Sequence, residues 1–231
     1  MRLLVDCGLG LKQLSVRLAG AGLVDDDIDA IFITHEHSDH IGCARQFSQR
    51  HRVPVWMSRG TYEGIGSPDF DGLLHTARDG EAIDLGGLQI MPFTVPHDAR
   101  EPLQLTCTDG AKKLGILTDL GHATAHLLTH LEHCNALLLE CNHDSDLLAQ
   151  SSYPPFLKRR VGGMYGHLSN TAAGEIARSV AHRGLKHLVT AHLSEQNNRP
   201  ELAYQAMSDA LGSVTEVTLA DAANGTRWLS I

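Results

Sequence analysis

The chain has 231 residues and a formal net charge of −8, with acidic and basic residues mixed along its length. This length is typical of one domain with a substantial core, so we expect a single domain over residues 1–231. The acidic balance excludes a protein that recruits nucleic acid through a global basic field, so a polyanion would have to be bound through metals and a local basic patch.

Targeting signals and disulfide patterns are absent from the sequence. No apolar run approaches the roughly 18 residues of a membrane span, and the N-terminus has no signal-peptide pattern. The five cysteines have no C-x-x-C spacing, which indicates buried thiols in a reducing compartment. We therefore expect a cytoplasmic protein without membrane contact.

The first elements are a strand at residues 3–8, which ends in a glycine turn, and an amphipathic helix at 11–18 closed by Gly20. A second buried strand covers residues 31–33, and it leads directly into the ligand-type residues His35, His37, Asp39 and His40. A helix is predicted from Ile41 onward. The polar residues thus lie on a turn between a strand's carboxyl end and a helix, where α/β folds carry their chemistry, and their H-x-H-x-D-H spacing indicates two adjacent cations.

The motif T-H-E-H-S-D-H resembles the signature of the metallo-β-lactamase superfamily. That resemblance implies an α/β fold of the αβ/βα sandwich type with a binuclear metal site. We call the turn that carries His35, His37, Asp39 and His40 the His turn. Asp6 is similar to the aspartate with which family members support this turn, although a structural role, capping the turn at the end of the first strand, would account for Asp6 equally well. Family members usually begin with a further β-hairpin, and this chain starts inside the pattern. Either the start is misassigned or the sandwich lacks its first hairpin, and the second alternative would leave a bare sheet edge open to aggregation or dimerisation.

Further strands and helices follow in the order that the fold requires. We predict a surface loop with one helical turn at 60–80, a hairpin with an Asp-Gly turn, and two closing strands near the C-terminus. The predicted strands are 53–57, 88–95, 103–107, 114–118, 136–140, 186–191, 214–220 and 226–231, and the helices are 123–134, one opening at 154–155, 171–182 and 201–211.

Three of these strands end in further ligand-type residues, His97, Asp119 and His192. Each alone could be a turn or structural residue. The order of the chain and the family pattern together assign metal one to His35, His37 and His97, and metal two to Asp39, His40 and His192. Asp119 matches the family's bridging carboxylate, which would fix two ions about 3.5–4 Å apart.

The blocks around Glu140-Cys141-Asn142-His143-Asp144, Gly166-His167 and His192 are similar to the YycJ (WalJ) branch of the superfamily, whose members are reported or proposed to be DNA exonucleases. This resemblance marks Asn142 and His143 as substrate-binding candidates. The basic run Lys158, Arg159 and Arg160 precedes a glycine segment and is a candidate for gripping phosphates, with a solvated helix end as the alternative. His167 could bind a phosphate oxygen, protonate a leaving group, or cap the helix that follows.

These residues predict a hydrolase with two divalent ions, Zn²⁺ or Mn²⁺, with Fe²⁺ as a further candidate. In this scheme a hydroxide bridging both ions attacks a phosphodiester, Asp39 orients the hydroxide, and His167 is the second catalytic residue. DNA is the favoured substrate. A thioester or lactone hydrolase with an apolar acyl pocket, and a metal-stabilised binding module without turnover, are the two alternatives.

Overall fold

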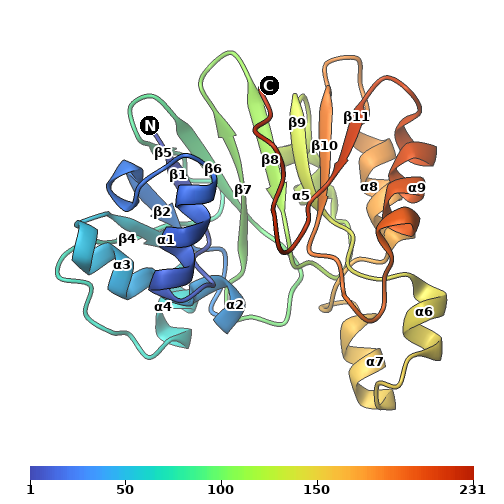
Figure 1. Cartoon of the computed structure of the whole chain (residues 1–231), viewed down its shortest axis with the longest axis horizontal. Helices are drawn as coiled ribbons and strands as arrows, with labels where there is room; N and C mark the ends of the chain where they lie inside the picture. The colour runs from blue at the N-terminus through green and yellow to red at the C-terminus, as the bar shows by residue number, and fades with distance from the viewer. The chain divides into compact units, whose positions relative to one another are not determined.

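The computed structural model describes residues 1–231 (Figure 1). The chain divides into two compact units. The first unit comprises residues 1–94 and 99–103, and the second comprises 95–98 and 104–231. The expectation of one domain over the whole chain stays a prediction.

The first unit contains a parallel four-stranded sheet in the order β1-β2-β3-β4. Its strands are β1 (Leu3–Val5), β2 (Ala30–Phe32), β3 (Val55–Met57) and β4 (Leu74–Thr76). Its helices are α1 (Leu11–Gly20), a 3-10 turn (Asp25–Asp27), α2 (Ser38–Ile41), α3 (Ala44–His51) and α4 (Arg59–Gly64). An antiparallel pair, β5 (Ile83–Asp84) and β6 (Gln89–Thr94), completes the unit.

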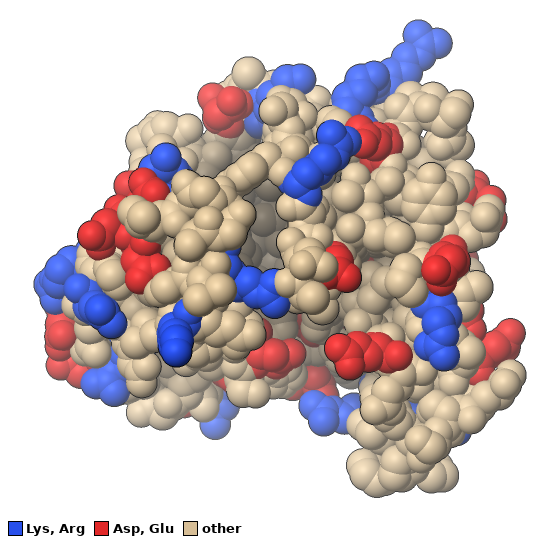
Figure 2. Space-filling model, in the orientation of Figure 1, with Lys and Arg blue, Asp and Glu red and all other residues tan.

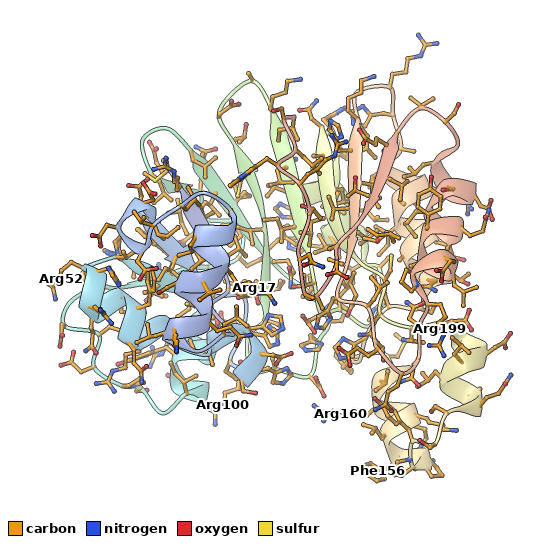
Figure 3. All side chains as sticks on the ribbon, viewed as in Figure 1. Arg17, Arg52, Arg100, Phe156, Arg160 and Arg199 are labelled. Carbon is orange, nitrogen blue, oxygen red and sulfur yellow. The ribbon has the colours of Figure 1, made fainter.

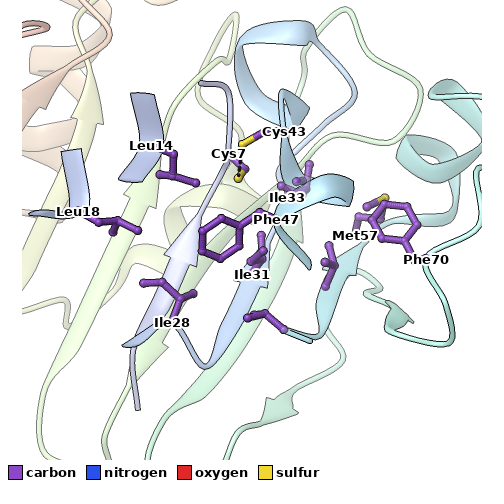
Figure 4. Packing of buried hydrophobic residues seen from close by; sticks show 13 residues of the cluster. Cys7, Leu14, Leu18, Ile28, Ile31, Ile33, Cys43, Phe47, Met57 and Phe70 are labelled. Atoms are coloured by element: carbon purple, nitrogen blue, oxygen red, sulfur yellow. Dashed lines mark hydrogen bonds between the residues drawn. The ribbon is translucent and has the colours of Figure 1, made fainter. Parts of the chain in front are cut away.

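The core of the first unit lies between this sheet and the helices (Figure 4). Ile31 and Ile33 pack with Phe47 of α3 and Leu14 of α1, and all four are buried. Every residue of β2 is buried, which explains its uninterrupted apolar composition, because parallel strands are covered on both faces. Truncating Phe47 to alanine would cost about 3–5 kcal/mol of stability by the usual scale for buried aromatic residues. The core therefore holds β2, the strand that leads into the His turn.

The helix predicted from Ile41 onward is interrupted. α2 ends at Ile41 and α3 begins at Ala44, because Gly42 adopts a positive φ of 30°. A Cβ at Gly42 would lie 2.4 Å from the carbonyl oxygen of Cys7. The close approach of two backbones, which hydrophobic periodicity does not reveal, thus divides the helix in two.

The second unit contains five neighbouring strands in the order β11-β10-β9-β8-β7. They are β7 (Leu103–Thr108), β8 (Lys113–Leu117), β9 (Ala136–Glu140), β10 (His187–Ala191) and β11 (Glu216–Leu219). β7 and β8 form the predicted antiparallel hairpin, and the later pairs are parallel. The helices are α5 (Ala125–Leu131), α6 (Ser145–Gln150), α7 (Pro155–Val161), α8 (Asn170–Val180) and α9 (Pro200–Leu211).

One prediction about local structure is confirmed in part and another is wrong. The stretch 60–80 contains the predicted helical turn as part of α4, but it also contains β4, which was not predicted. Residues 226–231, predicted as a strand, form none; β11 is the last strand, and a turn closed by Asp221 and Gly225 follows it. Trp228 is 73% exposed, so the apolar residues of this tail do not reach the core that a closing strand would need.

The cysteine prediction is confirmed in part. All five thiols are buried and unpaired by disulfides, and the sulfur atoms of Cys7 and Cys43 lie 3.6 Å apart as a hydrogen-bonded pair. Burial raises the pKa of Cys134 to about 11 and of Cys107 to about 12. None of the helices combines the length and apolarity needed to cross a membrane.

Candidate metal centre

The His turn of the first unit brings imidazole nitrogens together. It follows β2, which ends at Phe32, and enters α2 at Ser38. His35 and His40 are buried, with ring centroids 4.1 Å apart, whereas Asp39 is exposed. His35 Nε2 and His37 Nδ1 are separated by 2.9 Å. Two nitrogens bound to one Zn²⁺ at about 2.05 Å would be roughly 2.9–3.3 Å apart, so the spacing of this pair fits a shared ion.

Asp6 holds the His turn from the end of β1. Its carboxylate accepts hydrogen bonds from Thr34 N at 2.8 Å and from His40 Nδ1 at 2.7 Å. The Thr34 hydroxyl lies 3.0 Å from His35 Nδ1. With the Nδ1 atoms of His35 and His40 engaged in this way, Nε2 is the nitrogen that each can offer to a metal. The sequence did not decide whether Asp6 orients the His turn or only caps it. These contacts support the orienting role.

Close backbone contacts also fix the position of the turn. A Cβ at Gly8 would lie only 1.7 Å from the carbonyl oxygen of Asp39. The backbone N–H of Cys7 donates to the carbonyl of His40 at 2.7 Å. The glycine after β1 therefore lets the His turn lie directly against the β1–α1 loop.

A second cluster of ligand-type residues lies in the second unit. His97 and Asp119 are buried, and His192 directly follows β10. Asp119 Oδ1 lies 4.0 Å from His97 Nε2, 3.4 Å from His192 Nδ1 and 3.3 Å from His167 Nδ1. Burial lowers the pKa of His97, which favours the neutral imidazole that a metal requires. His97 Nδ1 donates to the carbonyl of Gly166 at 3.1 Å, so Nε2 is the nitrogen on the side of Asp119.

Glu140, the last residue of β9, organises this cluster and was not predicted. Its carboxylate is fully buried and accepts hydrogen bonds from Nδ1 of His167 at 2.7 Å and of His192 at 2.9 Å. The backbone N–H groups of Leu120 and Leu168 donate to its other oxygen, each at 3.1 Å. A carboxylate that closes an otherwise apolar strand was the signal available in the sequence.

The ionisation of this pair follows from these contacts. Burial opposes the charge on Glu140, but the hydrogen bonds from His167 and His192 outweigh it and lower its pKa. Burial likewise opposes the charge on His167, and the hydrogen bond and charge of Glu140 outweigh it and raise that pKa. The structure therefore favours the ionised form of Glu140, and this carboxylate both orients His167 and stabilises a proton on its ring.

Three residues of the two clusters adopt left-handed backbone conformations. φ is 61° at Asp6, 53° at Asp119 and 58° at His192. Each lies just beyond the end of a strand. Such conformations cost roughly 1–3 kcal/mol for residues other than glycine and concentrate at functional sites.

The predicted substrate-binding residues have several intramolecular contacts. Asn142 and His143 are 8% and 4% exposed, and Asn142 Nδ2 donates to the carbonyl of His192 at 3.1 Å. Lys158 Nζ donates to the carbonyl of Ala149, and Arg160 Nε to Asp98 Oδ2, both at 2.6 Å.

Arg159 is the member of the basic run that lies exposed in the last turn of α7 with no side-chain hydrogen bond or ion pair. Arg160, labelled in Figure 3, is also largely exposed despite its ion pair. Lys and Arg are interspersed with Asp and Glu over the face shown in Figure 2. The basic residues therefore form a local segment on α7 rather than a broad basic surface. Substrate binding stays a prediction for Asn142, His143, Lys158, Arg159 and Arg160.

The structure thus gathers His35, His37, Asp39 and His40 in the first unit, and His97, Asp119 and His192, together with His167 and Glu140, in the second. Imidazole nitrogens with a few carboxylates are a donor set that suits Zn²⁺, Mn²⁺ or Fe²⁺. In both clusters a carboxylate, the partly buried Asp6 or the fully buried Glu140, bonds imidazole Nδ1 atoms, as is common around metal-binding histidines. The residues present fit divalent metal ions.

Comparison with known proteins identifies the family. Residues 1–193 match the family described as the beta-lactamase superfamily domain. The chain is 32% identical to the exodeoxyribonuclease YycJ of Bacillus anthracis over 215 residues, which cover 91% of this chain and 81% of that protein. It is also 32% identical to the exodeoxyribonuclease WalJ of Streptococcus pneumoniae over 216 residues, covering 91% and 80%.

A solved structure supports the fold assignment. The metallo-beta-lactamase fold protein YhfI from Bacillus subtilis aligns with a TM-score of 0.74 at 20% identity, covering 98% of this chain and 86% of that one. The predicted fold class and the resemblance to the YycJ (WalJ) branch are confirmed. The chain belongs to the β-lactamase superfamily and has the metallo-β-lactamase fold.

Proposed function

We propose that this metal-dependent hydrolase cleaves phosphodiester bonds of DNA as an exonuclease. The observation that carries the proposal is the hydrogen-bonded pair formed by His167 and the fully buried Glu140, whose carboxylate lies 2.7 Å from His167 Nδ1. Asp119 Oδ1 lies 3.3 Å from the same nitrogen, so Nε2 of His167 is left to face a substrate. The names of the YycJ and WalJ relatives support the same activity.

The His167–Glu140 pair is suited to an oxygen leaving group. Glu140 bonds Nδ1 of His167, so Nε2 is the nitrogen that can pass a proton to the departing alkoxide. A sugar alkoxide needs that proton far more than a thiolate does. A thiol has a pKa of about 8.5, so it can leave as the thiolate without being protonated. The pair therefore favours a phosphodiester or another oxygen ester over a thioester.

We assign the metal ligands as the sequence predicts them. His35, His37 and His97 would hold one ion, Asp39, His40 and His192 the other, with Asp119 shared between them. Two divalent ions in such a site supply Lewis-acid polarisation of the phosphoryl group and lower the pKa of water.

The chain's own residues would then have distinct tasks. Asp6 and Glu140 hold the imidazoles in the tautomers that present metal-binding nitrogens. Asp39, whose carboxylate is exposed 3.7 Å from His40 Nε2, would orient the attacking water. The exposed Arg159 would contact a phosphate of the DNA strand.

Metal analysis and substrate comparison test this proposal. We expect the purified chain to bind two ions of Zn²⁺ or Mn²⁺, and the loaded protein to degrade single- or double-stranded oligonucleotides labelled at either end. Thioester and lactone substrates would be assayed beside them on the same preparation. His167→Gln should reduce oligonucleotide cleavage while metal content is retained, and the exposed His75→Gln serves as the matched control.

Three outcomes would contradict the proposal. Faster turnover of a thioester or lactone than of DNA would make the chain an acyl hydrolase. Two bound ions without hydrolysis of any substrate would favour a metal-stabilised binding module. Full activity of His167→Gln would remove the proton donor from the mechanism.

A further inference from the structure

Large apolar side chains are exposed on α7 and the glycine segment that follows it. Phe156 is 65% exposed, and Met164 and Tyr165 are each 62% exposed. Phe156 lies at the outer end of α7 (Figure 3). Single exposed apolar residues are ordinary, but three large ones within residues 156–165 are a local concentration along the chain.

The part of this segment that bears Met164 and Tyr165 lies against the candidate metal cluster of the same unit. The carbonyl of Met164 accepts a hydrogen bond from His122 Nδ1 at 2.9 Å. A Cβ at Gly121 would lie 2.1 Å from that carbonyl and 2.7 Å from the Tyr165 nitrogen. Gly121 follows Asp119 by two positions, so the exposed Tyr165 belongs to a segment that packs directly on the Asp119 loop.

The segment is also ordered from its other side. His167 N donates to the carbonyl of Val161 at 2.8 Å, and Gly166 N donates to Gly163 at 3.0 Å. The carbonyl of Gly166 in turn accepts from His97 Nδ1. The backbone around Tyr165 is therefore hydrogen-bonded on both sides, and two of these bonds involve His97 and His167 of the candidate site. Because this backbone is already ordered, binding a ligand there would cost little conformational entropy.

Cations accompany the exposed apolar residues. Lys158, Arg159 and Arg160 occupy the last turn of α7, between Phe156 and Tyr165 in the chain. Aromatic faces with interspersed cations are the combination that single-stranded nucleic acids use, since bases stack on the rings and phosphates meet the cations. Two copies of this chain, each with a net charge of −8, would repel each other overall, which disfavours a second copy as the occupant.

We infer that Met164 and Tyr165 form a stacking platform for an unpaired base of a DNA strand next to the bond to be cleaved. The inference rests on the proposed function, because it places that base beside the Asp119 loop. Stacking is tolerant of sequence, since every base has a π-face, and so would suit an enzyme that removes nucleotides of any kind. The α7 cations would contact the phosphates of the neighbouring nucleotides.

Binding in the absence of metal separates this inference from catalysis. The anisotropy of a fluorescent oligothymidylate would be titrated with the full chain in EDTA. We expect Tyr165→Ala to weaken binding roughly 5- to 150-fold, the range of base stacking. Tyr165→Phe should bind like the unaltered chain. Tyr204→Ala, which removes an exposed tyrosine from α9, is the matched control and should change nothing.

A terminal abasic nucleotide tests whether the lost contact is a stacked base. It should weaken binding to the unaltered chain and have no further effect on Tyr165→Ala, because both changes remove the same interaction. Equal affinities of Tyr165→Ala and the unaltered chain for the intact strand would overturn the inference. A change in oligomeric mass on Tyr165→Ala with unchanged DNA affinity would overturn it too, and would make the platform a protein contact.

Hydrolysis assays on the metal-loaded variants distinguish the two proposals. If the unaltered chain binds single strands through Tyr165 but hydrolyses no DNA, the platform stands and the exonuclease proposal fails. If DNA is cleaved with the same KM by the unaltered chain and by Tyr165→Ala, the exonuclease proposal stands and the platform fails.

Discussion

Replacing Asp6 with asparagine tests how the His turn is prepared for metal. Asparagine tolerates the left-handed backbone at this position and keeps an oxygen that can accept from Thr34 N. The amide nitrogen, however, would face His40 Nδ1, which now donates to Asp6 Oδ2 at 2.7 Å. His40 would have to move its proton from Nδ1 to Nε2, the nitrogen that it can otherwise offer to a metal.

The size of the effect follows from this exchange. Removing a carboxylate that supports a metal-binding histidine typically costs 10- to 100-fold in affinity, or about 1.4–2.7 kcal/mol. The metal-free protein would lose one charge-assisted hydrogen bond, worth about 1.5–3 kcal/mol, and recover part of it through the new amide contact. A net loss of about 1–2 kcal/mol corresponds to a fall of roughly 2–8 °C in Tm for a chain of this length.

Competition with a fluorescent chelator would measure both metal affinities in Asp6→Asn and the unaltered chain, and scanning calorimetry in EDTA would measure Tm. We expect one of the two affinities to fall by the stated factor. Asp29→Asn is the control, because Asp29 is likewise an aspartate of the first unit but bonds Arg2 N instead of the His turn. Unchanged affinity for both ions would refute the argument that Asp6 selects the tautomer of His40.

Three other substitutions or conditions give defined expectations. Glu140→Gln should lower turnover about 10- to 100-fold in steady-state assays, because an amide cannot accept from both imidazoles while it also receives backbone N–H groups; normal turnover would contradict its positioning role. Gly8→Ala should lower Tm and metal content together, since its Cβ would overlap the carbonyl of Asp39; an unaltered melting curve would exclude that clash. Cys107 and Cys134 should resist alkylation at pH 8 in the folded chain, and rapid labelling of the folded chain would show that these thiols are accessible. The free energy of unfolding should fall as pH rises above about 9, because both pKa values are raised in the folded state and the thiols lose their protons on unfolding at that pH.

The sequence was informative where short-range pattern and chemistry coincide. The apolar run ending in His35 predicts a buried strand followed by a polar turn, and β2 with its His turn has that arrangement. Asp119 and His192 follow strands as expected, because parallel strands deliver the residues after them to one edge of a sheet.

The features that escaped prediction depend on contacts between distant segments. The break at Gly42 arises from the backbone of Cys7, which no helical periodicity encodes. Glu140 is recognisable as a site residue only once His167 and His192, which lie far along the chain, are seen to donate to it. The apolar residues of the C-terminal tail favour a strand, but the tail joins no sheet and Trp228 stays exposed.

The left-handed backbone at His192 carries a consequence for mutational experiments. Glycine would adopt that conformation without steric cost, which offsets part of the stability lost with the hydrogen bond from the His192 imidazole to Glu140. A library of variants sorted by cellular abundance should therefore accept glycine at this position, whereas the same library sorted by catalysis should reject it. A difference between the two rankings would show that histidine is kept at this position for catalysis at a cost in stability.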